Sequence, residues 1–207
     1  MESTPPVAAP PFAEPTPLGL LGLSIGCAAL IPIAFGWSVN AAAFRTASMY
    51  CLLFGGGCQF LAGIMALANK NLLGGTLFTT FAFNWVLNYV TLSNLGEGKL
   101  PDPHVGLSID ICFLIIFAVL TFAFGFYSKL LFAFLLDIDV LFLFRIMKEV
   151  FHAPALGLPI ALATVALAGI ALYLAFAILV NHAAGRTVFA IPGPLFMPTP
   201  APVGTGH

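Results

Sequence analysis

Apolar residues gather in six segments of about 20 residues, separated by short polar or Gly- and Pro-containing breaks. A helix of about 20 residues is long enough to cross the ~30 Å hydrocarbon core of a bilayer. The pattern therefore predicts six transmembrane helices. We place them at about 18–39, 47–68, 73–92, 105–126, 130–151 and 156–181.

The breaks contain the residues that usually interrupt apolar helices. Arg45 is expected to separate the first two segments, and the Asn-Lys-Asn at 69–71 separates the next two. A loop with Gly, Pro and charges of both signs occupies 93–104, and tight turns are expected at 127–129 and 152–157. An even number of spans places both chain ends on one side of the membrane. The basic residues divide almost evenly between the two sides, so the positive-inside rule does not say which side this is.

The two ends of the chain differ in composition from the apolar middle. Residues 1–14 are rich in proline and are predicted to be a disordered N-terminal tail. The first 17 residues contain no Lys or Arg, so the basic region of a secretory signal is missing. We assign 15–184 to one six-helix transmembrane domain and 185–207 to a proline-rich, extended C-terminal tail.

Composition supports a membrane protein. The chain has 207 residues, of which 60% are hydrophobic and only 7% are charged, whereas a soluble domain has about 25% charged residues. So short a chain cannot bury this much apolar surface in a soluble core, and most of it must face lipid. A net charge of −1 argues against nucleic acid as a partner. The expected fold class is an all-α polytopic membrane protein.

A stripe of polar residues runs along the third segment. Thr76, Thr80, Asn84 and Asn88 recur every four residues, which places them on one slowly drifting face of a helix. Polar groups in hydrocarbon need partners or water, so the stripe either lines a wet path or bonds neighbouring helices together. Four residues in register favour the path, and Gln59 of the second segment is a further candidate for it.

Glycines recur on one face of the first segment. Gly19, Gly22 and Gly26 are three or four residues apart, and Gly55 to Gly57 precede Gln59 in the second segment. Small residues at such spacing let membrane helices approach closely. We expect the first helix to pack tightly against its neighbours along this face.

Acidic residues occur unexpectedly deep in the apolar segments. Asp137 and Asp139 lie in the fifth segment, and because they are about 200° apart on a helix they cannot face one lumen. One of them faces the path while the other pairs with a neighbouring helix or subunit, or one of the two merely lies near an interface that water reaches. An intramembrane carboxylate is a candidate proton carrier. Asp110 opens the fourth segment, and Arg145 and Glu149 are expected to form a structural ion pair.

Motifs for enzymatic chemistry are missing from the sequence. The four histidines lie at segment ends or in tails, and no zinc-protease, nucleophile-elbow or phosphate-loop motif occurs. The four cysteines lie in apolar runs without a Cys-x-x-Cys pair, which is typical of small buried side chains. We expect no enzyme activity, no cofactor and no metal site.

Several motifs resemble those of one transporter family. The sequence PTPLGLLGL at 15–23 is similar to the signature that opens the first helix of the acetate uptake transporter family, with Pro15, Pro17, Leu18 and Gly19 in place. Later motifs of the family are resembled, in the same order, by four further stretches: FGGGCQFLAG at 54–63, GGTLFTTFAFNW at 74–85, ALYLAF at 171–176 and GRTVFAIPG at 185–193. The family includes succinate–acetate permeases of bacteria and their fungal relatives.

This resemblance implies a six-helix protomer in a homohexamer of the inner or plasma membrane, with cytoplasmic termini. Each protomer would have its own pore for acetate or a related small carboxylate such as succinate, moved with a proton. It also implies an apolar constriction from the first, third and fifth helices, which falls on Leu23, Phe81 and Ile138. Glu14 stands where the family signature has Asn, and Phe81 stands where relatives often have Tyr.

A transport mechanism follows from these residues. The Thr and Asn stripe would donate hydrogen bonds to a carboxylate, helped by helix N-termini near Pro17 and Gly74. The apolar constriction would exclude an ion but pass the neutral acid, so transport would be linked to a proton. Two alternatives stay open: a passive channel for urea, amides or ammonia, and a structural membrane subunit that transports nothing.

Overall fold

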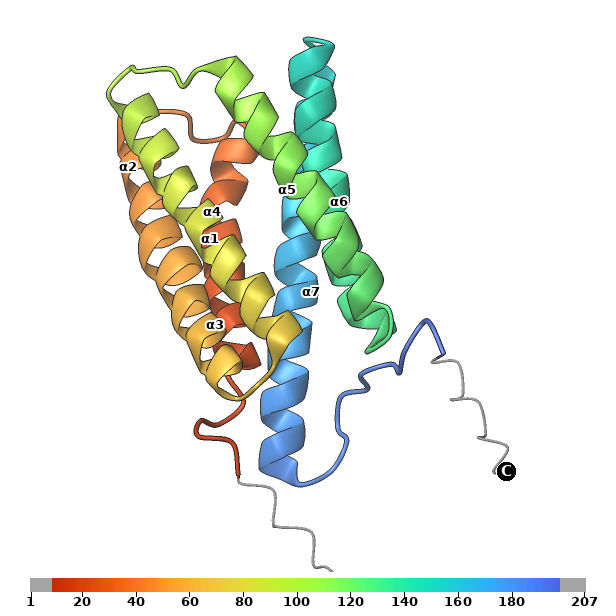
Figure 1. The fold of residues 1–207 in the computed structure, drawn as a ribbon. Coiled ribbons are helices and arrows are strands. Elements are labelled where there is room, and N and C mark those ends of the chain that lie inside the picture. Colours follow the sequence, from red (N-terminus) through yellow and green to blue (C-terminus); the bar gives the residue numbers. More distant parts are fainter. Residues whose placement is uncertain (1–8, 198–207) are drawn as a thin grey trace, which may run out of the picture.

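The computed structural model describes residues 9–197, and the regular structure in this range is helical (Figure 1). Residues 1–8 and 198–207, which include parts of both predicted tails, lie outside the described range. The elements in chain order are α1 (Thr16–Ala34), α2 (Ala41–Tyr50), the π-helical η1 (Cys51–Cys58), α3 (Gln59–Ala68), α4 (Leu72–Gly96), α5 (Pro103–Phe124), α6 (Lys129–Val150), the 3-10 turn η2 (Pro154–Leu156) and α7 (Gly157–Ala184).

The apolar segments predicted from the sequence correspond to these helices. Four stretches are long and apolar enough to cross a membrane, namely Thr16–Ala34, Ala41–Ala68, Pro103–Phe124 and Pro154–Ala184. Helices α4 and α6 are also long, with 25 and 22 residues, but polar or charged side chains interrupt them. The chain is therefore a multi-pass membrane protein, and its two most polar long helices need neighbours or water to satisfy them.

The first break lies earlier than predicted. Arg45 does not separate the first two segments, because it lies inside α2. The chain turns instead at Gly36, whose φ of 72° is a left-handed conformation that favours glycine. Asn40 then starts α2 by accepting a hydrogen bond from the Ala43 N–H at 2.9 Å. The charge of Arg45 indicated a break, but its long side chain can reach the membrane interface from a position one turn inside the helix, so the helix need not stop there.

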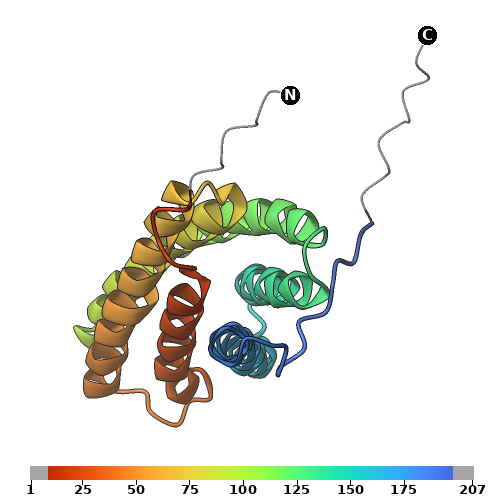
Figure 2. The same ribbon diagram turned by 90° about the horizontal axis from the view of Figure 1, so that it is seen from below.

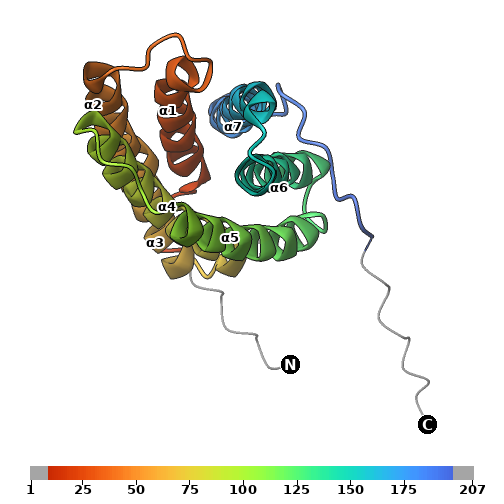
Figure 3. The ribbon, with the colours of Figure 1, turned by 90° about the horizontal axis from the view of Figure 1, so that it is seen from above.

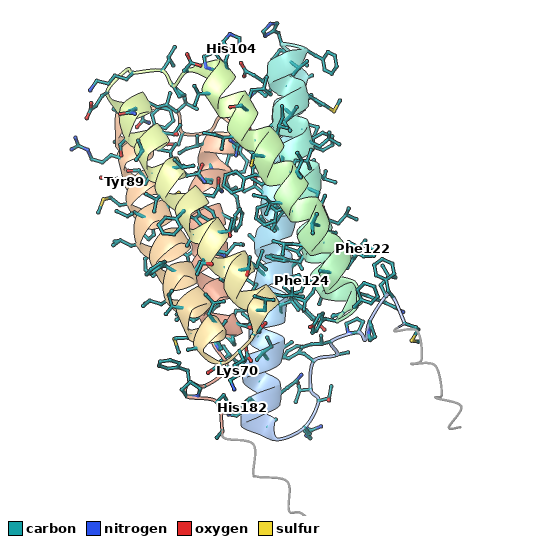
Figure 4. All side chains as sticks on the ribbon, viewed as in Figure 1. Lys70, Tyr89, His104, Phe122, Phe124 and His182 are labelled. Atoms are coloured by element: carbon teal, nitrogen blue, oxygen red, sulfur yellow. The ribbon has the colours of Figure 1, made fainter. Side chains whose placement is uncertain are left out.

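Viewed along the helices, α2–α3, α4 and α5 form an outer arc, and α1, α6 and α7 lie inside it (Figures 2 and 3). Helices α1, α4 and α6 all begin at the end of the bundle that has Lys70 and His182, which we call the lower end (Figure 4). Helices α5 and α7 begin at the opposite, upper end near His104. The described chain therefore starts and finishes at the lower end, as the even number of segments predicted.

The glycine face of α1 lets three neighbours pack directly against the helix backbone. A Cβ atom on Gly19 would come within 2.6 Å of the Phe78 ring, and one on Gly26 within 2.9 Å of the Trp85 ring. At Gly22 it would come within 2.5 Å of the Phe54 carbonyl oxygen. These contacts confirm the predicted close approach, and they fix α4 and η1 against α1.

The segment after α7 packs against the turn between α5 and α6. The Leu195 and Phe196 N–H groups donate to the Gly125 carbonyl at 2.8 and 3.0 Å, and the Lys129 N–H donates to the Gly193 carbonyl at 2.9 Å. The Phe196 ring also lies 5.3 Å from the Phe122 ring, centroid to centroid. The chain thus links the end of α7 to the lower end of the α5–α6 hairpin.

Candidate transport path

Two cavities lie in opposite halves of the bundle. The upper cavity, of about 190 Å³, lies among α1, α4, α6 and α7 and is lined in part by Cys27, Phe81, Asn84, Trp85, Asn88, Ile138, Leu141, Arg145 and Thr164. The lower cavity, of about 120 Å³, is lined in part by Thr16, Leu20, Asn71, Gly74, Phe78, Phe124, Tyr127 and Phe134. A cavity of about 150 Å³ holds benzene, so each is of a size for a small organic acid.

The three residues of the predicted constriction lie at the level between these cavities. Each is flanked on its own helix by one residue that lines the lower cavity and one that lines the upper cavity. The flanking pairs are Leu20 and Cys27 around Leu23, Phe78 and Asn84 around Phe81, and Phe134 and Leu141 around Ile138. The three residues are buried, with exposures of 0%, 5% and 1%, in one apolar cluster.

Phe117 of α5 adds a fourth wall at the same level, and the sequence reading missed it. Its side chain is fully buried, and its ring lies edge-on to the Phe81 ring at a centroid distance of 5.0 Å. It also stacks on the Phe142 ring at 5.7 Å. No sequence signal marks Phe117 in an apolar run with many phenylalanines, because only the packing of α5 against α4 and α6 selects it.

The polar stripe of α4 divides into two parts. Asn84 and Asn88 line the upper cavity. The hydrogen bonds found within residues 9–197 include none from either side chain. Thr76 is exposed and Thr80 is half-buried, and neither lines the two cavities. A four-residue step turns a helix by about 40° beyond one full turn, so the stripe moves about 120° around α4 from Thr76 to Asn88.

Gln59 is buried in the packing between helices. Its side chain is 1% exposed and lies outside the linings of both cavities. Within the described residues, its Oε1 atom has no hydrogen-bond partner. Its role in a substrate path therefore stays a prediction.

The two aspartates of α6 flank Ile138, and a hydrogen-bond partner on a neighbouring helix is found for one of them. Asp139 accepts a hydrogen bond from the Thr121 hydroxyl of α5 at 2.6 Å. This is the pairing with a neighbouring helix that the 200° separation allowed. One buried oxygen of Asp137 and the second oxygen of Asp139 have no hydrogen-bond partner in the described part of the chain. Neither aspartate lines a cavity described above.

Arg145 pairs with a different acid from the one predicted. Its Nη2 atom lies 2.9 Å from Asp110 Oδ1 on α5, and among residues 9–197 no ion pair joins it to Glu149. The prediction of an Arg145–Glu149 pair was wrong because the guanidinium turns inward, over the Phe142 ring at 5.5 Å. Arg145 lines the upper cavity, so it is a functional candidate that the sequence reading had treated as structural.

The signature residues form the start of α1 at the lower end. Pro15 occupies the cap position, Pro17 lies in the first turn, and Leu18 is exposed. Glu14, which replaces the Asn of the family signature, accepts hydrogen bonds from both the N–H, at 3.0 Å, and the hydroxyl of Thr16. Glu14 therefore caps the helix whose first residue lines the lower cavity.

The exposed loop between α4 and α5 carries one surface ion pair. The Lys99 ammonium lies 2.7 Å from Glu97 Oε2, and this hydrogen bond and charge hold the pKa of Glu97 below its ordinary value. Both side chains are exposed, so water screens the pair and it contributes little to stability. It leaves both charges in place at the upper end near neutral pH.

No protein-family model and no curated protein matches the sequence. Among solved structures, the chain is similar to one described as the structure of the bacterial acetate channel SatP. The two sequences are 21% identical, the match covers 87% of this chain and 99% of that chain, and the TM-score is 0.77. The likeness shows that the two chains share a fold across almost their whole lengths.

Proposed function

We propose that the protein is a membrane channel or transporter for small monocarboxylates such as acetate, and that the acid crosses its centre in the neutral form. The observation that carries the proposal is the pair of cavities, with the buried residues Leu23, Phe81 and Ile138 at helix positions between residues of the two linings. The fold shared with a bacterial acetate channel and the motif order of the acetate uptake transporters support the same substrate class.

The apolar side chains between the two cavities are the reason why we expect acetate transport to be linked to a proton. The side chains of Leu23, Phe81, Phe117 and Ile138 offer no hydrogen-bond donor. Moving an ionised carboxylate among apolar side chains costs far more free energy than moving its protonated form. Acetic acid would therefore cross this seal with its proton, and the carboxylate would regain water or donors on either side.

Both cavities have features suited to a carboxylate, namely hydrogen-bond donors in the upper cavity and a positive helix-dipole field in the lower cavity. In the upper cavity, the side-chain amides of Asn84 and Asn88 provide N–H groups. In the lower cavity, Thr16 and Gly74 lie in the first turns of α1 and α4, where the helix dipole favours a negative charge. The predicted path also includes Thr76, Thr80 and Gln59, which would reach it only if the helices shift during transport. In the conformation that the structure describes, we assign the upper part of the path to Asn84 and Asn88.

A flux assay in proteoliposomes tests the proposal. We expect protein-dependent uptake of labelled acetate to fall as external pH rises through the pKa of the acid, while uptake of labelled acetamide stays constant with pH. Liposomes without protein give the background, because acetic acid also crosses lipid. Acetate uptake that is independent of pH would contradict the neutral-acid mechanism.

The same assay separates the alternatives. Flux of urea or acetamide without acetate flux would indicate a channel for neutral solutes, and flux of no solute above background would indicate a structural subunit. The homohexamer, the inner- or plasma-membrane location, the cytoplasmic termini and the use of succinate stay predictions from family resemblance. The proton-carrier role of Asp137 and Asp139 is likewise a prediction, which uptake by the Asp→Asn variants would test.

A further inference from the structure

Among residues 9–197, Arg145 is the one basic side chain that lines the upper cavity, which the amides of Asn84 and Asn88 also line. Its side chain is 37% exposed, whereas that of its partner Asp110 is only 13% exposed. The guanidinium lines the cavity, and the carboxylate of Asp110, which projects from α5, lies outside the cavity lining. A charge held at this position would meet any solute that enters from the upper end.

The ion pair leaves part of the guanidinium available. Arginine has five N–H donors in a planar fork, and the contact with Asp110 involves Nη2. The Arg145 Cζ atom lies over the Phe142 ring, 5.5 Å from its centroid, and this contact helps to hold the group in place because an aromatic face attracts a cation. Phe142 is itself held by Phe113 and Phe117, at centroid distances of 5.4 and 5.7 Å.

We propose that Arg145 is a specificity-determining residue that binds the ionised carboxylate of the solute in the upper cavity, with Asn84 and Asn88 as neighbouring donors. Asp110 is its positioning residue, since it holds one edge of the fork and turns the rest toward the cavity. The inference rests on the proposed function and deepens it: the upper cavity takes the carboxylate as an anion, whereas the seal below passes only the neutral acid.

Trp85 provides a direct readout of binding, independent of transport. The chain has two tryptophans; Trp85 lines the upper cavity and is 2% exposed, whereas Trp37 is 73% exposed. In a Trp37→Phe background, purified protein is titrated with sodium acetate at neutral pH while Trp85 fluorescence is recorded. Acetamide, which has the shape of acetate without its charge, is titrated in parallel.

Three variants test the proposal. We expect Arg145→Gln to raise the half-saturating acetate concentration by about tenfold or more, because charge-assisted hydrogen bonds are the stronger ones, and to leave acetamide binding unchanged. Asp110→Asn keeps a side-chain oxygen that can still accept from Arg145 Nη2 and hold it in place, but it removes the competing negative charge, so the half-saturating acetate concentration should fall by about threefold. Lys148→Gln, which removes the same charge three residues later at an exposed position outside the cavity lining, should behave as the parent.

The outcomes distinguish this inference from the proposed function. Equal weakening of acetate and acetamide in Arg145→Gln, or unchanged acetate binding, would overturn the role of Arg145. If Arg145→Gln does not fold, Asp110→Asn decides: no gain in acetate affinity overturns the proposal. Arg145-dependent acetate binding without acetate flux in proteoliposomes would leave the inference standing and refute the proposed function.

Discussion

The upper and lower cavities obtain their polar groups from different parts of the helices. The upper cavity is lined by side chains in the middle and later turns of α4 and α6, above all Asn84, Asn88 and Arg145. The lower cavity is lined by helix starts, at Thr16 of α1 and Gly74 of α4. In the lower cavity the backbone donors are already used, because Glu14 accepts from the Thr16 N–H and Asn71 accepts from the Gly74 N–H.

This difference follows from helix direction. Helices α1, α4 and α6 begin at the lower end, so their positive dipole ends meet there, and a helix dipole acts only within about one turn of its end. The upper cavity lies beyond the reach of these three helix starts. Helix α7 begins at the upper end and lines that cavity from Ile160 onward, so the polar groups there are mainly the side chains of Asn84, Asn88 and Arg145 and not a group of helix starts. If the proposed function holds, the two halves of the path would attract an anion by different means, with side chains above and helix starts below the apolar residues between them.

The largest expected effect comes from removing the seal between the two cavities. Phe81→Ala deletes the ring that lies between them and packs on Phe117. We expect the variant to carry labelled succinate at a rate on the order of tenfold above the parent, since each ~1.4 kcal/mol removed from a barrier gives a factor of ten. Its thermal stability should also fall, because loss of a buried ring costs about 3 kcal/mol or more.

Phe83→Ala is the matched control for this experiment. It removes the same side chain two residues later, where the ring is 57% exposed and packs edge-on against Phe60. Its selectivity should equal that of the parent. Unchanged succinate exclusion in a folded Phe81→Ala protein would show that the cavities are not separated at this level.

A smaller effect is expected from changing the shape of the upper cavity alone. Gly26→Ala places a methyl group within 2.9 Å of the Trp85 ring, which lines that cavity. The ring must shift, so acetate affinity measured by Trp85 fluorescence should fall several-fold, and the unfolding free energy should fall by about 1–3 kcal/mol. Gly169→Ala on α7 is the control, because its Cβ would meet no atom within 4 Å.

Gly26→Ala would sharpen the comparison if the lower cavity is spared. The Gly26 contact with Trp85 lies on the upper side of Leu23, whereas the Gly19 contact with Phe78 lies on the lower side. Trp85 fluorescence and acetate affinity that stay at parental values in Gly26→Ala would mean that the glycine face packs helices without shaping the cavity.

Features with a regular period could be predicted from the sequence. Apolar runs of about 20 residues located the helices to within six residues at each end, and the spacing of Gly19, Gly22 and Gly26 indicated the tight face of α1. Both are local properties of one helix. Family resemblance singled out Leu23, Phe81 and Ile138, and the structure places them between residues that line the two cavities. Their role as a constriction stays a prediction.

Features that depend on two helices could not be predicted. Spacing on α6 favoured Glu149 as the partner of Arg145, but the crossing of α5 brings Asp110 closer. Phe117 becomes a wall of the seal only because α5 packs there. The drift of the α4 stripe was known, yet which of its residues meet a cavity depends on where α1, α6 and α7 stand around it.

The smallest effect is expected from the charge at the start of α1. Glu14→Gln keeps an oxygen that can accept from the Thr16 N–H but removes a negative charge beside the rim of the lower cavity. The helix dipole would then attract acetate more strongly from that side, by about twofold, since a charge at a helix end contributes about 0.3–1 kcal/mol. High salt should abolish the gain, because exposed charges are screened.

Uptake measured from each side of oriented proteoliposomes checks this prediction. In Glu14→Gln, the half-saturating acetate concentration should change only at the lower side. Glu97→Gln, in the loop at the upper end, is the control and should leave the value at the lower side unchanged. An equal change at both sides would mean that the two cavities share one anion site, and the distinction between helix ends below and side chains above would fail.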